Sequence, residues 1–129
     1  MRKLLTLTVL VLTVFSTPVF AEWTEVDENF DGDTFYVDFE RIRKHGGYVY
    51  YWELGDYLKP NKQGNLSGKR YNQGDCNLFR FSVLSYIFHQ QPMGRDVGDT
   101  EEPVNKEWRY PSPNSVNEII LKSVCAYAK

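Results

Sequence analysis

The segment from Tyr48 to Tyr57 constrains the fold more than any other part of the chain. Its side chains alternate between two faces, with Tyr48, Tyr50, Trp52 and Leu54 on one and Val49, Tyr51 and Glu53 on the other. A period of two is typical of a β-strand, in which successive side chains point to opposite faces. Tyr, Trp and Val also favour strands. We therefore expect a sheet built around this segment.

Further strands are expected on both sides of it. His45-Gly46-Gly47 is a tight turn, so residues 34–44 should form a hairpin with residues 48–57. Strand-forming residues also predict strands at 23–26, 67–72, 75–89 and 104–110. The stretches 59–68 and 90–103 are rich in Pro, Gly, Asn and Gln and are expected to be exposed connections.

The C-terminal part changes to helical periodicity. Its apolar stripe consists of Val116, Ile120 and Val124, with Leu121 and Cys125 on the flank. Two helix starts compete: Ser112-Pro113 places an N-cap before proline, whereas Ser115 and Glu118 form a capping box. The chain is thus expected to be α+β, with an antiparallel sheet of about five or six strands and a C-terminal helix on one face.

The N-terminus has the order of a secretory signal. Arg2 and Lys3 precede a mostly apolar run over residues 4–15, and Pro18 and Val19-Phe20-Ala21 follow. We predict a signal peptide over residues 1–21 and a single mature domain over residues 22–129. An uncleaved membrane anchor is the alternative, because the uncharged stretch 4–21 is near the shortest length that spans a bilayer. No other apolar run is long enough to span a membrane. There is no cysteine near the predicted cleavage site, so a lipid anchor is not indicated.

The two cysteines, Cys76 and Cys125, both lie in the predicted mature segment. Export places them in an oxidising environment, where an even pair is expected to form a disulfide. Two free thiols are the alternative.

The distribution of charge limits the classes of partner that the chain is expected to bind. The chain has 17 acidic and 15 basic residues, and two of the basic ones lie in the predicted signal peptide. A mildly acidic domain argues against nucleic acid binding. Locally, no acidic residue occurs between Asp56 and Asp75, and the candidate binding patch there is Lys59, Lys62, Lys69 and Arg70. It would suit anionic glycans, lipid headgroups or an acidic protein. A connection that is merely polar and soluble is the alternative.

Aromatic side chains are a second candidate for binding. Tyr50, Tyr51, Trp52 and Tyr57 could stack on sugars or on a peptide. Because strand faces alternate, about half of them should instead belong to the core.

No catalytic residue, cofactor or metal site is predicted. The chain has no nucleophile elbow and no phosphate-binding loop, and we expect His45 and His89 to be loop residues at the surface. The carboxylates of Asp27, Glu28, Asp31 and Asp33 share one polar turn, which gives no contrast in environment for acid–base catalysis. A small hydrolase whose site only the fold assembles is the remaining enzymatic alternative.

One segment resembles a calcium-binding loop. Asn29, Asp31 and Asp33 are followed by Glu40 at the twelfth position. The sixth position, however, is Thr34 where such loops require glycine, and a strand is expected to start there. We therefore expect a solvated acidic turn.

An ordered series of short motifs runs along nearly the whole predicted domain. It comprises Phe35-Tyr36-Val37-Asp38, Val49-x-x-Trp52-x-Leu54-x-Asp56-Tyr57, Ser67, Lys69, Asp75-Cys76, Arg80, Met93-Gly94, Trp108, Pro111, Ser115-x-x-Glu118 and Val124-Cys125. The series resembles the surface-adhesin protein E family. This resemblance implies an antiparallel sheet with a packed helix and a Cys76–Cys125 bridge.

The resemblance also implies a non-enzymatic binding module in the periplasm or at the cell surface. The best-known members of the family are adhesins that bind host matrix proteins and can form dimers. A protein is therefore one expected partner, the basic patch adds an anionic glycan as another, and the chain is expected to be a monomer or homodimer. A periplasmic accessory protein that binds another envelope protein, without adhesion, is the alternative.

Overall fold

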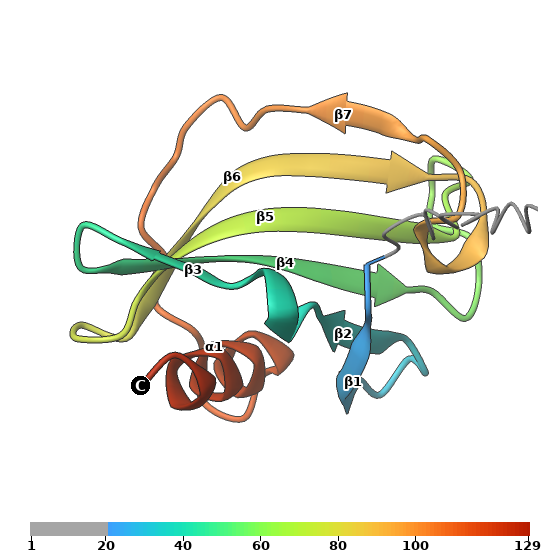
Figure 1. Cartoon of the computed structure of the whole chain (residues 1–129). Coiled ribbons are helices and arrows are strands. Elements are labelled where there is room, and N and C mark those ends of the chain that lie inside the picture. The colour runs from blue at the N-terminus through green and yellow to red at the C-terminus, as the bar shows by residue number, and fades with distance from the viewer. Residues whose placement is uncertain (1–20) are drawn as a thin grey trace, which may run out of the picture.

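The computed structural model describes residues 21–129, so the predicted signal peptide lies almost wholly outside the described residues. In the described part, seven strands form one antiparallel sheet and a helix follows them (Figure 1). The strands are β1 (Thr24–Glu28), β2 (Thr34–Val37), β3 (Arg43–His45), β4 (Tyr48–Asp56), β5 (Ser67–Asp75), β6 (Arg80–His89) and β7 (Asp99–Glu101). The helix α1 spans Val116–Tyr127. The α+β class is confirmed.

Strand β4 lies at the centre of the sheet, whose order is β1-β2-β4-β5-β6-β7. One edge of β4 pairs with two strands, because β3 lies along its first half and β2 along its second half. The hairpin around Gly46-Gly47 is confirmed, and both glycines have positive φ angles of 60° and 83°. A continuous strand over residues 34–44 is wrong: a 3-10 turn at Phe39–Arg41 separates β2 from β3.

The opposite edge differs from the prediction in two places. Strand β7 lies inside the stretch 90–103 that we expected to be a connection. Its Asp-Thr-Glu sequence has no apolar pattern, as suits a short, polar edge strand. The strand predicted at 104–110 is wrong, because only Arg109 forms a bridge, with Phe81. Edge pairing of this kind depends on where the chain returns to the sheet and not on local propensity.

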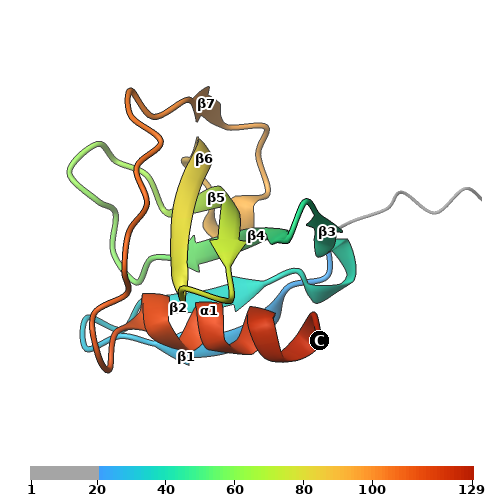
Figure 2. The same cartoon turned by 90° about the vertical axis from the view of Figure 1, so that its left-hand side faces the viewer.

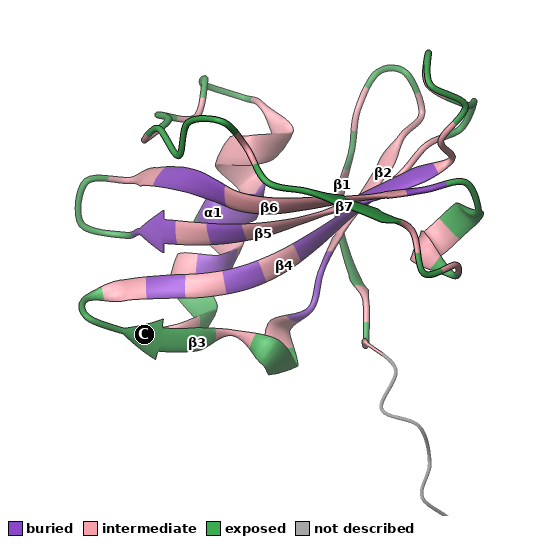
Figure 3. Ribbon diagram, turned by 90° about the horizontal axis from the view of Figure 1, so that it is seen from above, coloured by how far each residue is buried: buried purple, intermediate pink, exposed green. Residues whose placement is uncertain are grey.

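The helix begins at the later of the two candidate starts. Ser115 is the N-cap, and its Oγ accepts a hydrogen bond of 3.2 Å from the Glu118 backbone N–H. The helix packs beside β1 and β2 on one side of the sheet (Figure 2). Its buried residues pack against buried residues of the sheet, and the ribbon is purple at buried positions in Figure 3. The core cluster consists of Val37, Val49, Tyr51, Ile120, Leu121 and Val124.

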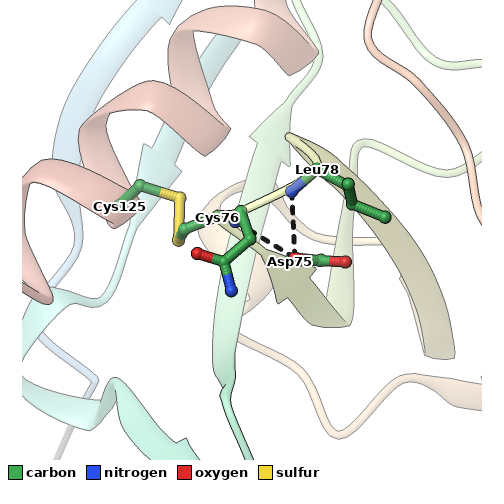
Figure 4. The surroundings of a disulfide bond; sticks show 5 residues. Asp75, Cys76, Leu78 and Cys125 are labelled. Carbon is green, nitrogen blue, oxygen red and sulfur yellow. Dashed lines mark hydrogen bonds between the residues drawn. A yellow bond between two sulfur atoms is a disulfide. The ribbon is translucent and has the colours of Figure 1, made fainter.

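A disulfide joins the helix to the β5–β6 turn. Cys76 and Cys125 are bridged, with their Cα atoms 5.7 Å apart (Figure 4). Asp75 orders the turn, because its Oδ1 accepts hydrogen bonds from the backbone N–H groups of Asn77 and Leu78 at 3.1 and 3.2 Å. Its other oxygen accepts from Arg80 Nε at 3.0 Å. The predicted pairing is confirmed.

Candidate binding surfaces

The four residues of the predicted basic patch do not lie together. Lys59 and Lys62 are exposed in the β4–β5 connection. That connection is turned by Asn61, whose Oδ1 accepts hydrogen bonds from the backbone N–H groups of residues 63 and 65 at 3.0 and 2.9 Å. Lys69 and Arg70 are successive residues of β5 and therefore point to opposite faces of the sheet.

Lys69 and Arg70 are both engaged within the domain. Lys69 donates from Nζ to the Gly94 carbonyl oxygen at 3.3 Å, and burial lowers the pKa of its ammonium group. Arg70 forms an ion pair with the buried carboxylate of Glu53 and donates from Nη2 to Asn117 Oδ1 at 2.7 Å. Burial lowers the pKa of Arg70, but the Glu53 carboxylate outweighs this and holds it above its usual value. Lys59 and Lys62 are thus the members of the patch whose charges stay in solvent.

The sheet presents a row of aromatic side chains on the side away from α1. We call this row the outer aromatic face; it consists of Tyr48, Tyr50, Trp52, Tyr71 and Trp108, all partly exposed. Ring centroids are 4.9 Å apart between Trp52 and Tyr71, 6.2 Å between Tyr50 and Tyr71, and 5.4 Å between Tyr48 and Trp108. The Arg80 guanidinium lies 4.3 Å from the Trp108 ring centroid. These contacts hold the rings in fixed positions.

Two of the four aromatic candidates from the sequence belong to this face. Tyr50 and Trp52 lie there, whereas Tyr51 is 1% exposed and belongs to the core. Tyr57 lines a hollow on the other side of the sheet. Sequence reasoning missed Tyr71 and Trp108, because their place beside Trp52 and Tyr48 depends on register between distant segments. Alternation along residues 67–75 was the only signal for Tyr71.

The second surface is a concave site that we call the inner hollow. It lies between β4, β5, β6 and the first turn of α1 and has a volume of about 410 Å³. Its lining includes Glu53, Gly55, Tyr57, Gly68, Arg70, Tyr86, Phe88 and Asn117. The sequence carried no motif for this site, since its residues come from β2, β4, β5, β6 and α1 and from the segments beside them.

The two histidines have different environments. His45 is exposed at the end of β3, as expected. His89 was expected at the surface, and this is wrong: its side chain is completely buried beneath the connection of residues 90–98. Its Nδ1 lies 3.1 Å from Asp96 Oδ1. Burial, with a smaller contribution from Lys69, lowers the pKa of His89 despite the opposing effect of Asp96.

The calcium-like segment forms an ordinary polar turn. Asn29 Oδ1 accepts hydrogen bonds of 3.0 Å from the backbone N–H groups of Asp31 and Asp33, and Thr34 begins β2 as expected. Within residues 21–129, no group of three or more His, Cys, Asp or Glu side chains is placed to hold a metal ion. In the same range, no helix combines the length and apolar character needed to cross a bilayer.

The fold is similar to solved structures of Haemophilus influenzae protein E. Crystal form II of that protein matches with a TM-score of 0.60 and 18% sequence identity, covering 88% of this chain and 94% of the other. A structure from non-typeable Haemophilus influenzae matches with a TM-score of 0.54 and 16% identity, covering 85% and 79%. At these identities the similarity shows a shared fold.

Sequence comparison gives the family. No curated protein matches the chain significantly. The family model for surface-adhesin protein E, however, matches residues 23–126, which include every strand and nearly all of the helix. The chain therefore belongs to the surface-adhesin protein E family.

Proposed function

We propose that this chain is an exported, non-enzymatic binding module of the bacterial envelope or surface, and that it binds its partner through the outer aromatic face. Membership of a surface-adhesin family supports the adhesin-like class. The leader-like residues 1–21 support export and a mature domain that begins at Glu22. We choose this surface because it gathers partly exposed Tyr and Trp side chains.

The chemistry of the outer aromatic face suits a macromolecular partner. Tyr and Trp contribute a disproportionate share of binding free energy at protein interfaces, because they offer large apolar area with a polar group. Stacking between neighbouring strands fixes these rings before binding, which lowers the entropy lost on association. A partly exposed row of this kind offers a broad contact area without a deep pocket.

A pair of double variants tests the proposal. Replacing Tyr50 and Tyr71 by Ser should weaken binding at least about tenfold, because two aromatic contacts are lost. The control variant replaces Phe30 and Val104, whose side chains are fully exposed and lie outside the face, by Ser. Binding is measured by surface plasmon resonance on immobilised matrix proteins and on envelope extract, with thermal melts to verify folding.

The outcomes separate the two functional candidates. Binding to matrix proteins that depends on Tyr50 and Tyr71 supports adhesion. Binding that is confined to envelope extract supports the accessory-protein alternative, with the same surface in use. If both folded double variants bind as well as the parent protein, the outer aromatic face is not the contact surface.

A further inference from the structure

The inner hollow exists because two glycines face each other across β4 and β5. Gly55 and Gly68 are register partners, and the ring of Tyr57 lies over both of them. A Cβ atom on Gly68 would lie 2.7 Å from Tyr57 Oη, and one on Gly55 would lie 3.1 Å from Phe35 Cε1 and 3.3 Å from Tyr57 Cε1. A side chain at Gly68 would displace the Tyr57 ring, and one at Gly55 would crowd the rings of both Phe35 and Tyr57. The glycines thus leave room for an aromatic ring on the floor of the hollow.

A second aromatic surface borders this floor. Phe88 is the β6 partner of Gly68 and lines the hollow. Its ring is nearly parallel to that of Tyr86, with centroids 5.8 Å apart and planes inclined by 6°. The hollow therefore has aromatic rings contributed by β2, where Phe35 lies, by the end of β4 and by β6.

The polar wall lies one step along the same strands. Glu53 and Arg70 are the next inward-facing register pair, roughly 7 Å from the glycine pair. They are ion-paired, and Asn117 of α1 accepts a further hydrogen bond from Arg70. A guanidinium has five N–H donors and a carboxylate has about four acceptor positions, so both groups keep capacity for a ligand. Their charges cancel, which leaves the wall polar but electrically neutral.

This combination selects the kind of ligand. A cation or an anion would meet a charge of its own sign in the ion pair, and a wholly apolar ligand would leave the Glu53 and Arg70 groups without hydrogen bonds. A sugar satisfies both sides: its C–H face stacks on aromatic rings, and its hydroxyl groups both donate and accept hydrogen bonds. The volume of about 410 Å³ is within the range of small-molecule sites.

We propose that the inner hollow is a binding site for a neutral saccharide unit, with Tyr57 as the stacking platform and Glu53, Arg70 and Asn117 as the hydrogen-bonding groups. The site lies on the opposite side of the sheet from the outer aromatic face. It is therefore independent of the function proposed above and is tested separately from it.

The test is NMR titration of the ¹⁵N-labelled domain over residues 22–129 with cellobiose, lactose, maltose and chitobiose. We expect saturable shifts at Tyr57, Arg70 and Phe88 for at least one of these sugars. Tyr57→Leu should weaken that binding at least about tenfold, whereas Tyr57→Phe should bind within a factor of about two, because it keeps the ring. Thermal melts of both variants verify that each is folded.

Additional binding measurements define the outcomes that would overturn the proposal. The best sugar is compared free and coupled to a carrier protein, which separates a soluble sugar from the end of a glycan as its source. Stronger binding of glucuronate or of inorganic phosphate would make the hollow an anion site, and stronger binding of a tyrosine-containing peptide would make it a peptide site. The proposal is also wrong if no sugar shifts these signals at about 10 mM, or if Tyr57→Leu binds like the parent.

Discussion

At the scale of single residues, His89 combines burial with a titratable ring. Lys69 and Asp96 are the charged groups that act on it, and Nδ1 faces Asp96. The folded state lowers its pKa, so the unfolded chain binds more protons than the folded one as the pH falls below about 6.5. Stability contributed by neutral His89 is therefore present above the unfolded pKa and is lost towards lower pH.

We accordingly expect the melting temperature to fall between pH 7.5 and pH 5.5. A loss of 1 kcal/mol lowers it by about 4–8 °C in a domain of this size. His45→Gln, which removes the exposed histidine, should show the same dependence. Differential scanning calorimetry at both pH values measures it. Equal melting temperatures, or a dependence that disappears in His45→Gln, would show that His89 is not the responsible group.

The residue scale is also where the sequence was least informative. Arg70 was predicted to belong to the exposed basic patch, because no acidic residue occurs between Asp56 and Asp75. In the structure it pairs with Glu53 on the inner side of the sheet. The neighbouring Lys69 points to the opposite side. Local sequence gives the alternation but not which face meets the helix. To predict the inner hollow, one would have to know which face of each strand meets the helix and how three strands are aligned in register. Local sequence gives neither, so the hollow could not be predicted.

At the scale of elements, the disulfide is the main covalent constraint. It joins positions 49 residues apart and attaches α1 to the β5–β6 turn. Closing a loop of that length lowers the entropy of the unfolded chain, which stabilises the domain by about 4 kcal/mol.

We expect Cys76→Ser and Cys125→Ser to lower the melting temperature by similar amounts, and the double variant to be little worse than either. All three changes remove the same bond, so their effects should not add. Thermal melts followed by circular dichroism, with the reduced parent protein as a control, measure this. Strongly additive losses would contradict the stabilising role of a single shared bridge.

Strong local patterns predicted the elements well, and weak ones did not. The alternation predicted β4 as a strand, and the apolar stripe predicted the buried face of α1, where Ile120 and Val124 are buried. Strand β7 has three exposed polar residues, so nothing in its sequence distinguishes it from a loop. The segment 104–110 has strand-forming residues, but its backbone pairs with the sheet only at Arg109.

At the scale of the whole molecule, charge is distributed unevenly over an acidic protein. Lys59 and Lys62 project from an exposed connection, whereas Arg70 is held inside by Glu53.

Replacing both lysines by Glu should leave the free energy of unfolding within about 0.5 kcal/mol of that of the parent, as is usual for surface positions. Arg70→Glu should be clearly destabilising, because it places two carboxylates in one buried site. Urea unfolding measures both.

The same lysine variant tests the anionic partner. We expect its retention on a heparin column to decrease if Lys59 and Lys62 attract anionic glycans, with the difference vanishing at high salt. Retention equal to that of the parent at low salt would exclude this connection as a glycan contact.

The Cys76–Cys125 bridge also makes part of the chain a covalent ring, which contains β6, β7 and the exposed stretch around Val104. Peptide bond cleavage by a protease inside this ring would open the backbone without releasing a fragment. Both pieces would stay joined through sulfur, and the central strands β4 and β5 would remain outside the cut region. A domain with this connectivity can survive a cut in the exposed stretch around Val104 as a single covalent molecule.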